Sequence, residues 1–111
     1  MSKPFKVERL TKIHEHWDSD DPTKFLVQAH AEITCAGEAG GEAVTVTVMS
    51  PAQLAADLDA GAVELGRGLV FMHDYDEASI IRTLQRIIDG AKATDWDALQ
   101  DVLGQYFEWL E

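Results

Sequence analysis

The sequence predicts an α+β fold: a four-stranded, mainly antiparallel sheet in the order β-β-β-α-β-α-α, with the helices packed on one face. Three observations support this prediction. Apolar and polar residues alternate in two stretches of the first half, 24–35 and 43–49. Apolar residues recur with helical spacing in two stretches of the second half, 77–90 and 95–110. The length of 111 residues, 46% of them hydrophobic, suits a single domain, 1–111, with its own core.

The first three strands follow from alternation and from the turns between them. The first begins at Phe5, with Phe5, Val7 and Arg9 on one face, and continues through 11–17 after a bulge. The loop 18–22 is rich in aspartate and ends in proline, which cannot join a strand ladder. The second strand, 24–35, has one apolar and one polar face, as in an antiparallel sheet covered on one side. A glycine-rich turn, 36–41, leads into the third strand, 43–49.

Capping residues and glycines mark the remaining elements. Ser50-Pro51 is typical of a helix start, and Gly61 of its end. After a short link through 62–65, the apolar run 69–72 predicts a fourth strand, buried on both faces. A long helix is expected from a cap at Asp76 or Asp74 to about Gly90.

A last helix is expected from a cap at Thr94 to the end of the chain, because Thr94 and Asp97 have capping-box spacing. Its apolar arc is wide and includes Trp96 and Trp109. Its other side is polar and carries the carboxylates of Asp97, Asp101 and Glu108.

Charge is the strongest compositional signal, because twenty acidic residues against nine basic ones give a formal net charge of −11 at pH 7. Four of the bases lie in the first twelve residues: Lys3, Lys6, Arg9 and Lys12. Such a field repels nucleic acid and anionic lipid and attracts cationic partners, although it is equally typical of a protein that is acidic for solubility. The single cysteine, Cys35, excludes an intrachain disulfide, and the absence of a long apolar run or a signal sequence indicates a cytoplasmic protein.

The sequence contains one candidate metal site and no assembled catalytic motif. His14 and His16, spaced to point to one side of a strand, adjoin several aspartates and could supply two zinc ligands. Nothing nearby completes the ligand set, so we expect no metal, cofactor or catalytic residue. Asp74 and Asp76 flank Tyr75 at a strand-to-helix junction, where helix capping is the simpler explanation. Trp17, beside the acidic loop, fits a core residue and an exposed anchor equally well.

These features together resemble a known family over residues 5–110. They comprise the first strand, the strand "FLVQAHAEI", the glycine-rich turn, the valine strand running into Ser50-Pro51 with Leu54, the junction "GRGLVFMHDYD", and the two final helices. The chain resembles the immunity proteins of bacterial polymorphic toxin systems, in particular the immunity protein 8 family. Trp96 and Trp109 look like two recurrent tryptophan positions of that family. The sequence departs from it at Gln53, where an aromatic residue is common, and at Met49, where a small residue or cysteine is common.

The resemblance implies a cytoplasmic antidote that binds a cognate toxin domain and blocks it without catalysis. Many such toxins are basic nucleases, so an acidic surface would compete with the nucleic-acid substrate and speed association. The candidate partner-binding residues are Asp97, Asp101 and Glu108 on the last helix, together with Asp74, Tyr75 and Asp76. Two alternatives remain: a small metal-binding protein or enzyme that uses His14 and His16, and an oligomeric scaffold module joined through the wide apolar arc.

Overall fold

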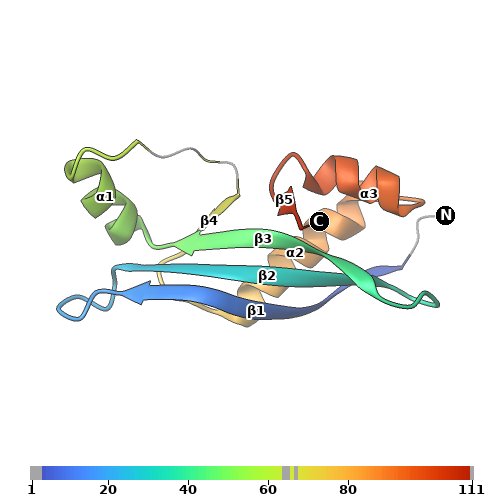
Figure 1. Cartoon of the computed structure of the whole chain (residues 1–111), viewed down its shortest axis with the longest axis horizontal. Helices are drawn as coiled ribbons and strands as arrows, with labels where there is room; N and C mark the ends of the chain where they lie inside the picture. Colours follow the sequence, from blue (N-terminus) through green and yellow to red (C-terminus); the bar gives the residue numbers. More distant parts are fainter. Residues whose placement is uncertain (1–3, 64–65, 67, 111) are drawn as a thin grey trace.

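The computed structural model describes residues 4–63, 66 and 68–110 of the chain. In this part the chain forms a twisted sheet with three helices, and Figure 1 shows α2 behind the three long strands. The elements in order are β1 (Phe5–Trp17), β2 (Phe25–Cys35), β3 (Gly41–Met49), α1 (Pro51–Asp59), β4 (Leu69–Phe71), α2 (Glu77–Ala91), α3 (Trp96–Leu103) and β5 (Glu108–Trp109). The basic residues Lys3 and Arg67, the predicted link residues 64–65 and Glu111 lie outside the described residues.

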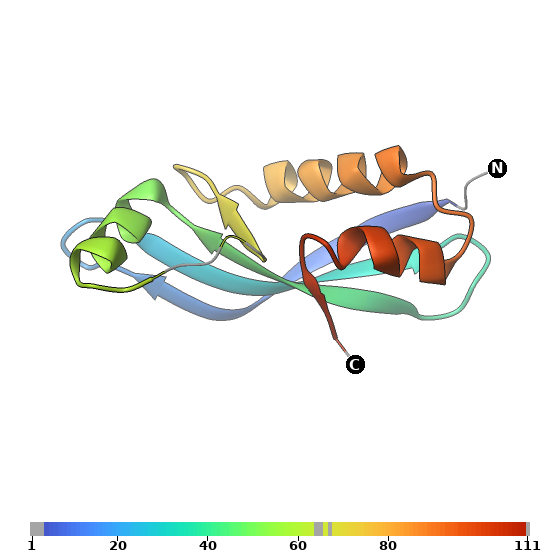
Figure 2. The same ribbon diagram turned by 90° about the horizontal axis from the view of Figure 1, so that it is seen from above.

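The sheet confirms the predicted α+β class and the four predicted strands. Its order is β1-β2-β3-β4, in which the pairs β1–β2 and β2–β3 are antiparallel and β4 is parallel to β3. The short β5 adds an antiparallel pair on β3, at Val44 and Thr45. Figure 2 shows α2 running along one side of the sheet, with α1 and α3 at opposite ends of the molecule.

The core lies between the sheet and the two later helices. Alternation in β2 is unbroken, so every second residue from Phe25 to Cys35 is buried and every residue between them is half-buried. The same face of β3 buries its valines, and α2 and α3 cover both strands with an apolar stripe that includes Ile80, Leu84, Ile88, Leu99 and Leu103. The opposite face of the three long strands carries mostly polar side chains, and we call it the open face.

Two bulges in β1 decide which of its side chains reach the core. The pairing with β2 passes from Val7 to Arg9 and again from Lys12 to His14, so Glu8 and Ile13 are extra residues. The first bulge moves Arg9 to the open face, where it pairs with Glu32, and Leu10 takes the core position. The expectation that Arg9 shares a face with Phe5 and Val7 is therefore wrong. The predicted continuation of this strand through Trp17 is confirmed.

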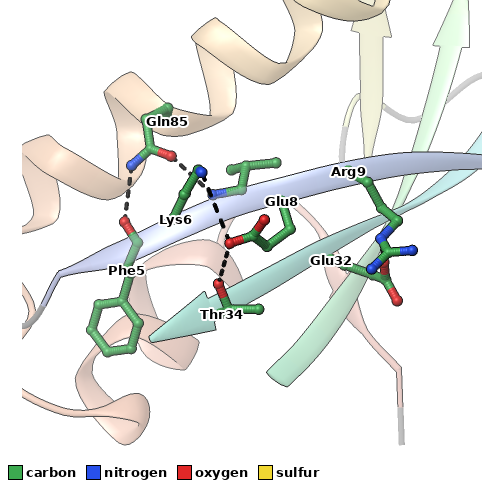
Figure 3. A network of polar contacts seen from close by, with 8 residues as sticks. Phe5, Lys6, Glu8, Arg9, Glu32, Thr34 and Gln85 are labelled. Atoms are coloured by element: carbon green, nitrogen blue, oxygen red, sulfur yellow. Dashed lines mark hydrogen bonds and ion pairs between the residues drawn. The ribbon is translucent and has the colours of Figure 1, made fainter. Parts of the chain in front are cut away.

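A glutamine of α2 holds the outer edge of β1. The Gln85 Oε1 atom accepts a hydrogen bond from Val7 N–H at 2.9 Å, and its Nε2 atom donates to the Phe5 carbonyl at 3.0 Å (Figure 3). The amide thus satisfies an edge donor and an edge acceptor, as a neighbouring strand would. It also fixes the middle of α2 and the start of β1 relative to each other.

The end of the chain departs from the prediction. Helix α3 is capped by Asp95, which accepts from Ala98 N–H at 2.8 Å, and not by Thr94. It ends at Leu103, and the chain then turns at Gly104 and pairs with β3 through Glu108 and Trp109. The indole of Trp109 donates to the Gln100 carbonyl at 3.1 Å, so the tryptophan folds back on α3. Edge groups of β3 therefore compete successfully with helix continuation.

The fourth strand is shorter and more exposed than predicted. Leu69–Phe71 lies beside β3, where Phe71 is 47% exposed, and the expectation of burial on both faces is wrong. The predicted caps of the other helices are confirmed, because Ser50 accepts from Gln53 N–H and Asp76 accepts from Ala78 N–H and Ser79 N–H. Helix α2 ends at Ala91, within a residue of the predicted Gly90. Lys92 follows as its C-cap in the left-handed conformation.

Candidate functional site

The six residues predicted to bind a partner fall on separate surfaces. Asp74, Tyr75 and Asp76 precede α2, whereas Asp97 and Asp101 lie on α3, which follows α2 in the chain. Along the chain, the 15 residues of α2, roughly 22 Å of helix, lie between the two groups. Glu108 was predicted on the outer side of the last helix, but it lies in β5, where it pairs with Thr45 of β3. All six are exposed except Tyr75, which is half-buried.

Three aromatic rings meet where β1 ends, β2 begins and the chain enters α2. Trp17 stacks on Phe25 with ring centroids 4.7 Å apart and an interplanar angle of 24°. Tyr75 meets both rings edge-on, at centroid distances of 6.5 Å to Trp17 and 6.3 Å to Phe25. Phe25 is buried, but Trp17 remains 42% exposed. Trp17, left open between core and anchor by the sequence, thus covers a core residue with one face and meets solvent with the rest.

Charged side chains surround these rings. The Lys12 ammonium lies 4.8 Å from the centroid of the Tyr75 ring and 3.2 Å from a carboxylate oxygen of Glu15. The same Glu15 oxygen accepts from the Trp17 indole N–H at 3.2 Å, and the Tyr75 hydroxyl donates to Glu77 at 3.5 Å. We call this group, Lys12, Glu15, Trp17, Phe25, Tyr75 and Glu77, the aromatic end.

The electrostatics of the aromatic end are visible in its tyrosine. Burial, followed by the nearby carboxylates of Glu77 and Glu15, raises the pKa of Tyr75 to about 12. The phenol therefore stays protonated at physiological pH. The hydrogen bonds from Lys12 and Trp17 act in the opposite direction on Glu15 and lower the pKa of its carboxyl. The ionised carboxylate of Glu15 and the neutral hydroxyl of Tyr75 thus belong to the same group of side chains.

Several neighbouring aspartates have structural duties. Asp18 and Asp21 accept backbone hydrogen bonds within the loop between β1 and β2, and Asp76 caps α2. With Glu15, Asp20, Asp74 and Glu77 they make seven carboxylates at this end, against the three cations Lys12, Lys24 and Arg82. The difference of four negative charges remains whatever local role each carboxylate has, so this end attracts cations.

The second acidic surface, on α3, has a simpler construction. Asp97 and Asp101 project from exposed positions, while Trp96 on the same helix packs edge-to-face against the buried Phe5, with centroids 4.8 Å apart. The aromatic residue of this helix therefore belongs to the core. Asp97 and Asp101 suit a solvated helix face as well as a docking surface.

A third acidic region is a groove of about 760 Å³ lined by Glu8, Arg9, Glu32 and the turn between β2 and β3. Two of the four carboxylates described in its lining have cationic neighbours: Arg9 pairs with Glu32, and Glu8 lies 4.0 Å from Lys6 and accepts from Thr34 at 3.0 Å (Figure 3). Unlike the aromatic end, the groove has no aromatic ring among the described residues that line it.

The histidines considered as metal ligands lie on the open face. The register places His14 opposite Gln28 and His16 opposite Leu26, and both histidines are exposed. Across the described residues, no three side chains of histidine, cysteine, aspartate or glutamate gather closely enough to hold a metal ion. Cys35 is buried at the end of β2, as its position on the apolar face predicted.

Sequence reasoning missed Lys12, Glu15 and Glu77 as members of a site. The first bulge of β1 turns Lys12 toward the helices, opposite Ala29, and the second returns Glu15 to that side, opposite Val27. Strict alternation from Phe5 places Glu15 on this face but gives no hint of Lys12, although a polar pair at core-facing positions of an edge strand is a recognised protective device. None of the described helices is long and apolar enough to cross a membrane.

Comparison with known proteins gives one match. A family model described as immunity protein 8 matches residues 5–110, nearly the whole chain. Searches of curated proteins and of solved structures found no match. The matched range includes every described element of the fold, from the start of β1 to β5.

Proposed function

Because the chain belongs to the immunity protein 8 family, and is thus an immunity protein of a polymorphic toxin system, we propose that it neutralises its toxin by forming a stoichiometric complex with the toxin domain. The family match over residues 5–110 is the observation that carries this proposal. Inhibition by binding requires no catalytic residue in the antidote. We place the complex in the cytoplasm, in agreement with a sequence whose single cysteine, Cys35, excludes an intrachain disulfide.

We further propose that the toxin domain is basic, and that its activity is that of a nuclease. The net charge of −11 supports this, since an acidic protein accelerates its encounter with a basic one and repels the nucleic acid for which it competes. The aromatic end adds apolar contact area to the charge. Surface charge alone gives a salt-sensitive encounter, whereas buried aromatic contacts slow dissociation.

The test starts with a pull-down from the native bacterium with the intact chain as bait, washed at low and at high salt. The retained toxin domain is then produced with and without the chain in a susceptible host. The molar mass of the purified complex is measured by light scattering. We expect one basic domain to survive the high-salt wash, a complex with a fixed ratio of the two chains, and growth only when both are present. A retained domain whose toxicity the chain leaves unchanged would contradict the proposal.

The nuclease part has its own measurement. Cleavage of DNA and of RNA by the purified toxin domain is followed as the chain is added in increasing amounts. Activity should disappear near equivalence. A toxin that the chain neutralises but that cleaves neither nucleic acid would remove the nuclease assignment and leave the antidote function intact.

A further inference from the structure

We propose that the aromatic end receives a cationic side chain of the toxin, an arginine or a lysine, on the ring of Tyr75 and beside the carboxylate of Glu15, where Lys12 now lies, with Glu77 at the tyrosine hydroxyl adding negative charge. This inference rests on the proposed function and assigns a binding surface and a recognition chemistry to it. Lys12 then acts as an internal occupant of a cation site, which the partner's side chain displaces.

The geometry around Lys12 is that of a cation site. Its ammonium lies 4.8 Å from the Tyr75 ring centroid, within the range of a cation–π contact, and 3.2 Å from Glu15. The contacts combine the negative face of a ring with an ionised carboxylate, two features that favour positive charge in one place. A guanidinium is planar and weakly hydrated, so it suits stacking on a ring beside a carboxylate better than an ammonium does.

One lysine leaves the site short of positive charge. Glu15 and Glu77 both lie beside Tyr75, and Glu77 contacts the hydroxyl at 3.5 Å. Within the aromatic end, the single ammonium of Lys12 thus stands against two carboxylates, one of which, Glu15, it contacts. Its side chain is also 36% exposed, and that of Glu15 42%, so an approaching partner can reach both. An exposed ion pair of this kind contributes little to stability, which makes Lys12 easy to displace.

Apolar surface adjoins the cation site. Trp17 is 42% exposed while its inner face stacks on Phe25, and Ile13, the extra residue of the β1 bulge, is 51% exposed. Tryptophan, tyrosine and arginine are the residues most enriched among those that dominate binding energy. A basic partner that covers Trp17 would also exclude water from the carboxylates, and this strengthens each charged contact.

The first experiment measures the affinity of the toxin domain identified above for variants of the intact chain. We expect Trp17→Ala and the double variant Glu15→Gln/Glu77→Gln to weaken binding by at least about tenfold each. Tyr106→Ala is the matched control for the tryptophan, because Tyr106 is 47% exposed elsewhere on the molecule, and it should bind as the wild type does. Circular dichroism of each variant checks the fold, and the double glutamine variant is nearly isosteric, so the test survives if Trp17→Ala fails to fold.

Removal of Lys12 gives the more specific test. Lys12→Met should tighten binding by about three- to tenfold, because the partner's cation no longer competes with an internal one. Lys24→Met removes the same charge from the same end of the sheet without emptying the site, so it reports the general effect of charge alone. Equal gains in the two variants would overturn the role assigned to Lys12.

A small probe tests the site without the toxin. Nα-acetyl-arginine amide is titrated into the wild type and into Lys12→Met, and the indole N–H of Trp17, assigned with Trp17→Phe, is followed by NMR. The neutral citrulline analogue is the control. We expect arginine to shift this signal, at lower concentration in Lys12→Met, and citrulline to leave it unchanged. Equal shifts with both compounds, or no shift at Trp17, would overturn the cation site.

Failure of the inference is distinguishable from failure of the proposed function. If the wild type binds and neutralises the toxin while Trp17→Ala and the glutamine pair bind within about twofold of it, the antidote function stands and the interface lies elsewhere. If the wild type neither binds nor protects, the proposed function itself fails, and the arginine titration then decides alone whether the cation site exists.

Discussion

A phenylalanine–tryptophan pair lies at each end of the β1–β2 ladder, and the two pairs have different fates. At one end Phe5 packs edge-to-face against Trp96 of α3, with centroids 4.8 Å apart. At the other, Phe25 stacks on Trp17, 4.7 Å away, on the neighbouring strand. Both phenylalanines are buried, but only in the first pair does the tryptophan belong to a helix. Trp17 itself is the cover for Phe25, so part of its ring remains in solvent.

The difference shows how one kind of contact can complete a core or create a surface. The Phe5 end gains α3 and the Gln85 amide, which together close the sheet. At the Phe25 end, charged side chains adjoin the partly exposed rings instead: Lys12, Glu15 and Glu77 contact Tyr75 or Trp17. We call the Phe5 end, with Trp96 and Gln85, the closed end. It should therefore matter most for stability, and the aromatic end most for partner binding.

Truncation of the two tryptophans should produce the largest contrast. Trp96→Ala removes a ring that packs on buried Phe5, and we expect a loss of about 3 kcal/mol in the free energy of unfolding. Trp17→Ala loses a half-exposed stack and should cost about 1 kcal/mol. Urea denaturation of the two variants measures both. Equal losses would show that the aromatic end is as much part of the core as the closed end.

Gln85 tests a second feature of the closed end. Gln85→Ala leaves Val7 N–H and the Phe5 carbonyl without their partner, and we expect a loss of about 1–2 kcal/mol. Amide hydrogen exchange should become faster at Val7 while it stays slow in β2. Gln105→Ala, which truncates an exposed glutamine, is the control. Unchanged exchange at Val7 would mean that the side-chain amide does not protect this edge of β1.

The two ends also differ in how much the sequence could reveal. Unbroken alternation predicted the buried face of β2 correctly, because a strand without irregularities keeps a period of two. In β1, the extra residue Glu8 reverses the alternation and Ile13 restores it, so Lys12, between the two bulges, faces the helices against the pattern. The sequence identified Tyr75 and left Trp17 undecided, but did not connect Lys12 and Glu15 with them.

The predicted extent of the last helix was wrong for a different reason. Residues 104–110 continue an apolar helical pattern, so local periodicity predicts helix throughout. In the fold, the edge of β3 is available to this segment: Leu110 N–H donates to the Ala43 carbonyl at 2.8 Å, and Trp109 turns back to Gln100. A pairing with a strand more than sixty residues earlier has no local signal. Placing Glu108 on a helix face was a consequence of that omission.

The cap of α2, next to the aromatic end, should make the stability of the protein depend on pH. Hydrogen bonds from the Ser79 hydroxyl, Ser79 N–H and Ala78 N–H lower the pKa of the Asp76 carboxyl. A depressed folded-state pKa stabilises the protein above the unfolded value, near 3.8, and this stabilisation is lost as the pH falls through the folded value. The urea concentration at the midpoint of unfolding should therefore decrease as the pH is lowered below about 4. In Asp76→Asn, this decrease of the midpoint with pH should be smaller.

Ser79→Ala is the companion variant, because it removes the largest cause of the shift and keeps the carboxyl. It should give an intermediate slope. Some slope will remain in both variants, since hydrogen bonds also lower the pKa values of Glu15 and Asp21. A slope identical to that of the wild type in Asp76→Asn would show that the cap carboxylate is not linked to folding.

The smallest expected effect is the ionisation of Tyr75, which reports the environment of the aromatic end directly. Its pKa of about 12 reflects burial first and the carboxylates of Glu77 and Glu15 second. The absorbance of the phenolate, followed with rising pH, should show a step near that value that is missing in Tyr75→Phe. Glu77→Gln removes one carboxylate and should move the step toward the ordinary value, 10.0, without reaching it, because burial remains. A step that does not move would mean that burial alone holds the proton, so that Glu77 contributes little field at the Tyr75 hydroxyl. The aromatic end would then resemble the closed end more than its surrounding charges suggest.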